Sequence, residues 1–335
     1  MSNVLDTVLL FALPASGKSE VRHYLDGLSP EQCREEFHMG ETVQLDDYPY
    51  VHFMHRIDDE LAMRDLPYVF YKGPNRPFIE DYEWGTLVEL LNEDFHDLVS
   101  GHVVNPSSAS QLLFDRIDAA RSKVGLPRSL GKLPYGVRCD MADAMEDEVR
   151  DELESKNERC KQDLKGKTIV MEAARGGPNG ASFPLTPPHG YDYLFSILSE
   201  EILHRASVLY VWVTPEESRR KNIERGRPDG QGSILHHSVP MEVMLGQYGC
   251  DDIDHLLASS DKADTIKVER TEVVGEGSDR RYELQTWHLP VARFDNRNDL
   301  TSFLRNDRSE WKDSEISALH NGLKDAFAVL ARLNA

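Results

Sequence analysis

The residues from Ala12 to Ser19 have the types and the spacing of a loop that binds phosphate groups. They match the pattern GxxxxGK[ST], except that Ala12 takes the place of the first glycine. In such a loop, backbone N–H groups and the positive end of the following helix surround the phosphates. Lys18 would reach the β- and γ-phosphates, and the hydroxyl of Ser19 would hold Mg²⁺. The residues expected to contact the nucleotide are Pro14, Ala15, Ser16, Gly17, Lys18, Ser19 and Glu20.

The segments on either side of this loop favour the same interpretation. Thr7 to Ala12 is a continuous apolar run, which is typical of a parallel strand buried on both faces. Glu20 to Leu25 can continue as a helix, and Gly17 lets the backbone approach a ligand without a Cβ in the way. The alternative is an ordinary strand, turn and helix with a surface lysine.

Four further apolar runs predict strands, and each ends in polar residues. They are residues 42–45, 167–171, 207–213 and 289–294. Helical patterns separate them, which predicts an α/β fold with a five-stranded parallel sheet covered by helices on both faces. Ligands bind such sheets at the carboxyl ends of the strands.

The motifs and their order resemble those of the P-loop kinases, in particular zeta-toxin-like, adenylylsulfate-kinase-like and nucleoside-kinase-like proteins. The resemblance covers residues 1–48, 166–228 and 287–305. It implies a kinase-type P-loop NTPase fold whose Walker A loop binds ATP and Mg²⁺.

The end of the second predicted strand carries two carboxylates, Asp46 and Asp47. The resemblance implies that an acidic residue here orients or deprotonates the acceptor hydroxyl. Across a cleft from Lys18, such a carboxylate would act as a general base or hold Mg²⁺ through water. We expect Asp47 to take this role ahead of Asp46, and the alternative is a turn rich in aspartate.

The third predicted strand ends in Glu172, and Arg175 follows one turn later. An acid and an arginine at this edge would serve the metal and an anionic or hydroxylated substrate. The alternative is a surface ion pair in a loop.

The helix predicted after Pro215 carries a dense basic patch in an otherwise acidic chain. It comprises Arg219, Arg220, Lys221, Arg225 and Arg227. It resembles the lid of P-loop kinases, in which arginines close over the transferring phosphoryl group. We expect Arg219 and Arg225 to act, because at most two or three of these side chains can face the same way. The alternative is a solvated helix face with Glu–Arg pairs.

The last predicted strand runs into Phe294-Asp295-Asn296. This turn resembles the loop that meets the adenine base in related kinases, which implies that Asn296 contacts the nucleotide. The alternative is a turn residue in the left-handed conformation with no ligand contact.

The remaining segments predict how the domains are organised. Residues 1–48 and 165–335 would form the kinase core, with a hairpin over about residues 265–288. Residues 49–164 are too many for one crossover and have mostly helical patterns, so we expect a helical insertion on the substrate side. Within it, residues 139–165 look like a long exposed helix that could serve a protein partner.

The amino-acid composition limits which binding partners and which cellular location we expect for the protein. The chain has 335 residues, and 38 Lys and Arg against 58 Asp and Glu give a net charge of −20. This charge disfavours bulk nucleic acid and anionic membranes as partners. The four cysteines form no CxxC pair, and the longest apolar stretch, Val8 to Leu13, is far too short for a membrane helix. No basic residue precedes that stretch, so we expect a cytoplasmic protein without a secretion signal.

Together these features predict a phosphotransferase that uses ATP and Mg²⁺ and acts on a small hydroxylated acceptor. A nucleoside, a nucleotide or a sugar nucleotide would fit. Two alternatives stay open: a nucleotide-binding regulatory ATPase or GTPase module, and a kinase of nucleic-acid ends. A carboxylate facing the P-loop and an arginine lid would favour transfer to an acceptor.

Overall fold

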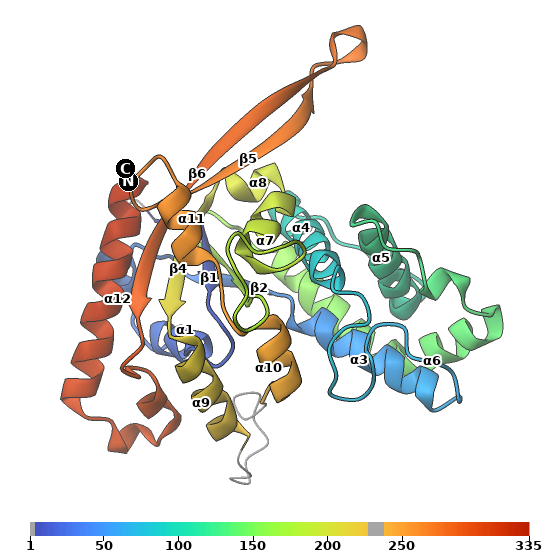
Figure 1. Cartoon of the computed structure of the whole chain (residues 1–335), viewed down its shortest axis with the longest axis horizontal. Helices are drawn as coiled ribbons and strands as arrows, with labels where there is room; N and C mark the ends of the chain where they lie inside the picture. The colour runs from blue at the N-terminus through green and yellow to red at the C-terminus, as the bar shows by residue number, and fades with distance from the viewer. Residues whose placement is uncertain (1–3, 227–237, 335) are drawn as a thin grey trace. The chain divides into compact units, whose positions relative to one another are not determined.

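The computed structural model describes residues 4–226 and 238–334, so Arg227 of the predicted basic patch lies outside the described residues. The chain has an α/β fold with a six-stranded, mostly parallel sheet in the order β2-β3-β1-β4-β6-β5 (Figure 1). Helices flank the sheet, and a helical region separates β2 from β3. The strands are β1 (Thr7–Phe11), β2 (Thr42–Asp46), β3 (Thr168–Ala173), β4 (Ala206–Trp212), β5 (Thr265–Val274) and β6 (Arg281–Asp295).

The apolar run that precedes the P-loop is the central strand β1, and all five of its residues are buried. It pairs in parallel with β3 on one side and with β4 on the other, so that Leu9 lies opposite both Met171 and Val208. A strand with neighbours on both edges and helices on both faces needs apolar side chains in both directions. The edge strand β2 instead alternates between buried and half-buried residues.

The predicted five-stranded sheet is wrong by one strand, because the predicted hairpin is part of the sheet. β5 pairs antiparallel with β6 from Thr265↔Pro290 to Val274↔Arg281, and β6 then continues to Asp295 beside β4. Pro290 lies where the pairing partner changes, and proline has no N–H to offer a ladder at that point. The outer part of the hairpin extends beyond the sheet as a ribbon (Figure 1).

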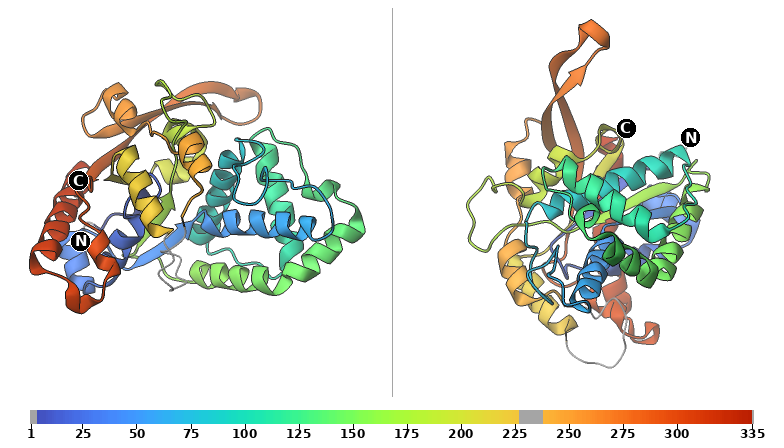
Figure 2. Two further views of the ribbon diagram at one scale, coloured as in Figure 1. Left: turned by 60° about the horizontal axis from the view of Figure 1, so that its bottom comes forward. Right: turned by 90° about the vertical axis from the view of Figure 1, so that its right-hand side faces the viewer.

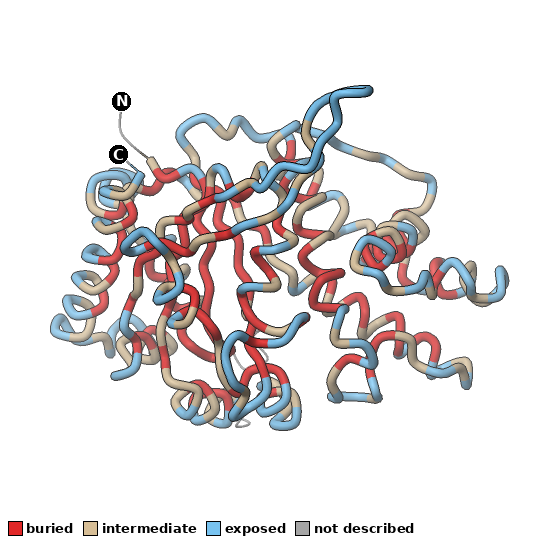
Figure 3. The backbone as a smooth tube through the Cα atoms, turned by 45° about the horizontal axis from the view of Figure 1, so that its top comes forward, coloured by how far each residue is buried: buried red, intermediate tan, exposed pale blue. Residues whose placement is uncertain are grey.

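Two layers of side chains hold the sheet between helices. On one face, α1 (Lys18–Asp26) and α12 (Asp313–Leu333) contribute Val21 and Phe327 to a core that includes Leu10 and Phe294. On the other face, Phe11 stacks on Tyr191 with ring centroids 4.8 Å apart. The central strands β1, β3 and β4 are accordingly buried through almost their whole length, whereas the outer parts of β5 and β6 are exposed (Figure 3).

The described chain forms two compact units, Met1–Gln44 with Gly166–Ser196 and Leu203–Ala335, and Leu45–Lys165 with Ile197–Ile202. The remaining helices are α2 (Pro30–Glu36), α3 (Tyr48–Ala62), α4 (Glu83–Ser100), α5 (Ala109–Lys123), α6 (Tyr135–Cys160), α7 (Gly190–Ile197), α8 (Glu200–Leu203), α9 (Pro215–Arg225), α10 (Met241–Gln247) and α11 (Ile253–Ser259).

The second unit is helical and has its own buried polar network. α3 and α6 lie side by side in it, as the blue and green helices of Figure 2 show. Asp94 on α4 accepts a hydrogen bond from Tyr50 and pairs with Arg116 at 2.7 Å and with Lys156 at 2.7 Å. These bonds join four helices, because each of the four residues comes from a different one. Such shared burial makes the four helices one folding unit.

Candidate functional site

The loop between β1 and α1 has a backbone that only glycine permits at one position. Gly17 lies just before α1 with a φ of 100°, in the left-handed region. A Cβ at Gly17 would come within 2.4 Å of Thr301 Oγ1 and 2.7 Å of Asn296 Nδ2. Ala15 also has a positive φ, of 57°. The loop is therefore wrapped tightly, with Thr301 and Asn296 directly behind it.

Four carbonyl groups of this loop accept hydrogen bonds from side chains. The Ala12 carbonyl accepts from Tyr191 OH at 3.0 Å, and the Leu13 carbonyl accepts from Ser16 Oγ at 2.6 Å. The Pro14 carbonyl accepts from Ser218 Oγ and the Ser16 carbonyl from Asn296 Nδ2, both at 2.7 Å. Three of the donors come from separate segments far along the chain: α7, α9 and the turn after β6. The negative ends of these four peptide dipoles are therefore hydrogen-bonded within the protein.

The N–H groups of the same loop are in the opposite situation. Within residues 4–226 and 238–334, no group accepts a hydrogen bond from the backbone N–H of Ala15, Ser16 or Gly17. The N-cap residue of α1, Gly17, has no side chain that could cap the helix, whereas Ser29 caps α2 and Thr214 caps α9. Successive N–H groups at the start of an uncapped helix make an anion-binding concavity.

Asn296 supports the loop from behind. It is fully buried, and its amide donates to the Ser16 carbonyl and to Thr301 Oγ1, the latter at 2.8 Å. Its Oδ1 accepts from the N–H of Leu300 at 2.7 Å. Both polar ends of the amide are therefore used within the protein, and the contacts assign Asn296 to the shape of the loop. The expected contact with adenine has no observation behind it.

Glu20 lies one residue after Ser19 and holds two arginines. Its side chain is buried and pairs with Arg225 at 3.0 Å and with Arg305 at 2.6 Å. Burial by itself would raise the pKa of Glu20, but the two guanidinium groups outweigh burial and lower it below 4.5. Arg305, which sequence reasoning missed, comes from the 3₁₀ turn Ser302–Arg305. Nε of Arg225 and Nη2 of Arg305 have no hydrogen-bond partner among the residues described.

The other basic residues of α9 lie in ion pairs with carboxylates. Arg219 pairs with Glu216 at 3.0 Å, and Arg220 pairs with Glu217 at 2.5 Å. Lys221 is fully buried and lies 2.7 Å from Asp299. The first two pairs are the Glu–Arg contacts at helical spacing that the alternative interpretation expected. Of the predicted lid residues, Arg225 is the one that reaches the helix following the P-loop.

Glu172 and Arg175 contact different partners. Glu172 is buried and pairs with Arg22 of α1 at 2.5 Å. Arg175 is buried, and its Nη1 donates to the carbonyl of Ala174 at 2.7 Å. The backbone N–H of Arg175 donates to Tyr191 OH at 3.3 Å, so Tyr191 joins the carboxyl ends of β1 and β3. The two residues do not form the surface pair that we considered.

Asp46 and Asp47 end β2 and begin the second unit. Asp46 is the last residue of the strand, and its Oδ1 accepts from the N–H of Tyr48 at 2.8 Å. Asp47 occupies the N-cap position of α3 but makes no capping hydrogen bond with its side chain. Both carboxylates are half-buried. The strand therefore delivers two acids to its carboxyl end, as the sequence predicted.

A further titratable group, which the sequence did not single out, lies close to the end of β4. Asp251 accepts a hydrogen bond from Tyr210 OH at 2.6 Å, and Tyr210 lies opposite Phe11 in the sheet. Burial raises the pKa of Asp251 to about 6. No sequence signal marked Asp251, because its contact with Tyr210 of β4 joins residues that are 41 positions apart in the chain.

The residues described hold no group of three or more His, Cys, Asp or Glu side chains able to bind a metal ion. None of their helices is long and apolar enough to cross a bilayer. No protein-family model matches the sequence, and no curated protein matches it. The case for a function thus depends on the geometry of the loop and its neighbours.

Replacing Asn296 by aspartate tests its role behind the loop. The shape stays nearly the same, but both donor hydrogens are lost and a carboxylate faces the Ser16 carbonyl. We expect the free energy of unfolding to fall by about 1–3 kcal/mol, as measured by urea denaturation. The backbone N–H of Leu300 keeps its acceptor in this variant, so unchanged stability would contradict the assigned hydrogen bonds.

Replacing Glu20 by glutamine tests the buried ion pairs. At pH 7 we expect a loss of about 3–5 kcal/mol, because the buried charge of Glu20 is removed and two half-buried arginines lose their counter-ion. The lowered pKa of Glu20 means that its stabilisation is complete well above 4.5 and is lost as the pH falls through the lower value in the folded state. Chemical denaturation at a series of pH values should therefore show the two proteins converging in acid.

The exposed Glu216, which pairs with Arg219, offers a matched control for that experiment. Glu216→Gln should change the stability little at any pH, because exposed ion pairs contribute little. An equal loss in the Glu20 and Glu216 variants would contradict the importance of the buried cluster.

Proposed function

We propose that this protein is a phosphotransferase that moves the γ-phosphoryl group of ATP to a hydroxyl of a small acceptor, on a kinase-type P-loop fold. One observation carries the proposal. Four carbonyls of the loop of residues 12–17 accept hydrogen bonds from side chains, while the N–H groups of Ala15, Ser16 and Gly17 have no acceptor among the residues described. Such a loop favours an anion with several oxygens, and the phosphates of a nucleotide fit this requirement.

The position of the loop in the sheet supports a ligand site there. From β1 the chain moves past β3 to β2, whereas from β4 it moves the other way to β6. The segments that follow the neighbouring strands β1 and β4 therefore run in opposite directions. In an open α/β sheet, this arrangement leaves a crevice at the carboxyl ends of the two strands. The contact of Ser218 with the carbonyl of Pro14 joins these two segments.

The residues at the start of α1 suit a nucleotide with its metal. Lys18 would neutralise the β- and γ-phosphates, and the Ser19 hydroxyl would be the protein ligand of Mg²⁺. The donor set fits a metal held mainly by phosphate oxygens, because no cluster of three carboxylates or imidazoles lies within the described part of the chain. When bound, Mg²⁺ would neutralise charge on the phosphates.

In the transfer step, the acceptor oxygen would bond to the γ-phosphorus while the bond to the β–γ bridging oxygen breaks and ADP leaves. We assign Asp47 to accept the proton of the acceptor hydroxyl, with Asp46 as the other candidate at the same strand end. Asp47 follows directly on the last residue of β2, at the carboxyl end of the strand, where ligands bind in parallel sheets.

The arginines would stabilise the charge on the transferring group. Arg225 and Arg305 suit this role better than Arg220, because Glu20 fixes them beside α1 and each keeps a nitrogen with no described partner. Arg219 stays a candidate, held by Glu216 on the half-exposed face of α9. Guanidinium groups match the spread of charge over the phosphoryl oxygens.

The decisive experiment measures ADP release from ATP and Mg²⁺ with a panel of nucleosides, nucleotides and sugar nucleotides. We expect one acceptor class to stimulate turnover, and Lys18→Ala to reduce the stimulated rate by about 100-fold or more. Asp47→Asn should reduce it by a comparable factor while ATP binding is kept. Lys262→Ala changes an exposed lysine and serves as the matched control.

The other outcomes distinguish the alternatives. ATP binding without stimulation by any acceptor would favour a regulatory nucleotide-binding module. Stimulation by 5′- or 3′-ends of short oligonucleotides alone would favour an end kinase. Failure to bind any nucleotide would contradict the assignment of the loop.

A further inference from the structure

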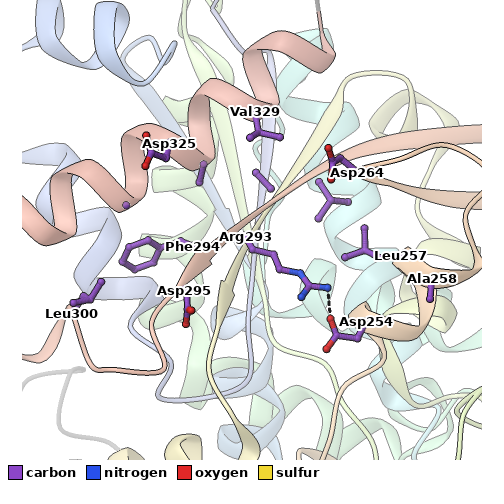
Figure 4. Close-up of a pocket in the computed structure, with 14 residues that line it drawn as sticks. Asp254, Leu257, Ala258, Asp264, Arg293, Phe294, Asp295, Leu300, Asp325 and Val329 are labelled. Carbon is purple, nitrogen blue, oxygen red and sulfur yellow. Dashed lines mark hydrogen bonds and ion pairs between the residues drawn. The ribbon is translucent and has the colours of Figure 1, made fainter.

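A groove of about 820 Å³ lies away from the P-loop, on the outer part of the first unit (Figure 4). The last residues of β6 form its base, and α11 and α12 form its two sides. Figure 4 shows Arg293 extending toward Asp254 on α11, with Asp325 on α12 at the opposite side. No residue assigned above to binding or catalysis lines this groove.

The base of the groove is an open strand edge. β5 pairs with β6 only as far as Pro290, and the N–H of Val291 then donates to the carbonyl of Asp264 at 2.9 Å. On the other edge of β6, the N–H of Asn296 donates to Trp212 of β4 at 2.9 Å. Alternate residues of a strand direct their backbone N–H and C=O groups to the same edge. The backbone groups of Arg293 and Asp295 therefore face away from β4, as those of Val291 do.

This stretch of edge has no partner. Among the residues described, none bonds to the backbone N–H or C=O of Arg293 on that side, or to the N–H of Asp295. Unpaired backbone groups in a row are a template for another strand. The groove lies between this edge and α12, and the helix packs very close to β6, since a Cβ at Gly322 would lie 2.9 Å from the ring of Phe294.

The side chains around this edge are apolar below and acidic at the rim. Leu257, Ala258 and Val329 supply apolar surface, while Asp254, Asp264, Asp295 and Asp325 supply four carboxylates. Three of these carboxylates lie in ion pairs: Asp254 with Arg293, Asp295 with Arg297 at 2.7 Å, and the exposed Asp264 with Arg332 at 3.8 Å. The side chain of Asp325 makes no ion pair or hydrogen bond with any residue in the described part of the chain.

We propose that this groove binds an extended, lysine- or arginine-rich segment of a partner protein, which adds a short strand to the open edge of β6. Backbone hydrogen bonds to Arg293 and Asp295 would fix the segment, and alternate side chains would reach the apolar floor and the carboxylates. The charge decides the kind of partner. A second copy of this chain carries −20 and would meet a rim on which Asp325 has no counter-ion among the described residues, so a basic segment is the complementary occupant.

The test uses fluorescence anisotropy with nine-residue peptides that have lysine or arginine at every second position and valine, threonine or alanine between. We expect saturable binding of at least one peptide at moderate salt. Methylation of alternate backbone nitrogens in that peptide should weaken binding about tenfold or more, because it removes the donors of a strand pair without changing the charge.

Two protein variants complete the test on the full chain. Asp264→Lys with Asp325→Lys should weaken binding about tenfold or more, and Ala258→Trp should block the groove sterically. Glu276→Lys with Asp279→Lys changes the net charge equally at the exposed hairpin turn and should leave binding unchanged. All of these positions are exposed, so the fold should tolerate them.

Several results would overturn the proposal. One is the absence of binding by every peptide, and another is equal weakening by the two double variants, which would indicate unspecific attraction. Insensitivity to backbone methylation would exclude strand addition. A dimer that sedimentation detects in the wild type and that Ala258→Trp abolishes would assign the groove to a second copy instead.

Discussion

In the loop after β1, four carbonyls accept hydrogen bonds from side chains, while three N–H groups have no acceptor among the described residues. A peptide group normally satisfies both of its polar ends, so a run of bound acceptors next to unbound donors leaves a concentrated positive potential. The hydroxyls of Tyr191, Ser16 and Ser218 and the amide of Asn296 create this imbalance. Without them the loop could turn its carbonyls toward an anion, and the site would lose its preference for phosphate.

The need to bind the carbonyls of the loop after β1 explains why segments remote in the sequence pack behind it. Tyr191 also receives the N–H of Arg175, and Asn296 also holds Thr301, so each support is itself tied to a second element. Glu20 extends the same frame by fixing Arg225 and Arg305 against α1. Donors held in this way need little reorganisation when charge develops, which is the physical basis of electrostatic catalysis.

Local patterns predicted the parts of this structure that depend on neighbouring residues. The strand, loop and helix around Lys18 and the acids at the end of β2 follow from periodicity and residue type. The continuous β6 was missed because the glycine-rich turn suggested a hairpin separate from the last strand, whereas one strand pairs with β5 as far as Pro290 and with β4 from Val291 on. The pairing of Glu172 with Arg22 and the burial of Asn296 depend on which surfaces meet, and no spacing in the chain encodes that.

The most direct test is a crystal structure of the protein with Mg²⁺ and a non-hydrolysable ATP analogue. The account predicts the β-phosphate oxygens within hydrogen-bond distance of the N–H groups of Ala15, Ser16 and Gly17, with the metal at the hydroxyl of Ser19. It also predicts that Asn296 and Ser218 keep their bonds to the loop. A nucleotide bound elsewhere, or a loop whose carbonyls turn toward the ligand, would contradict it.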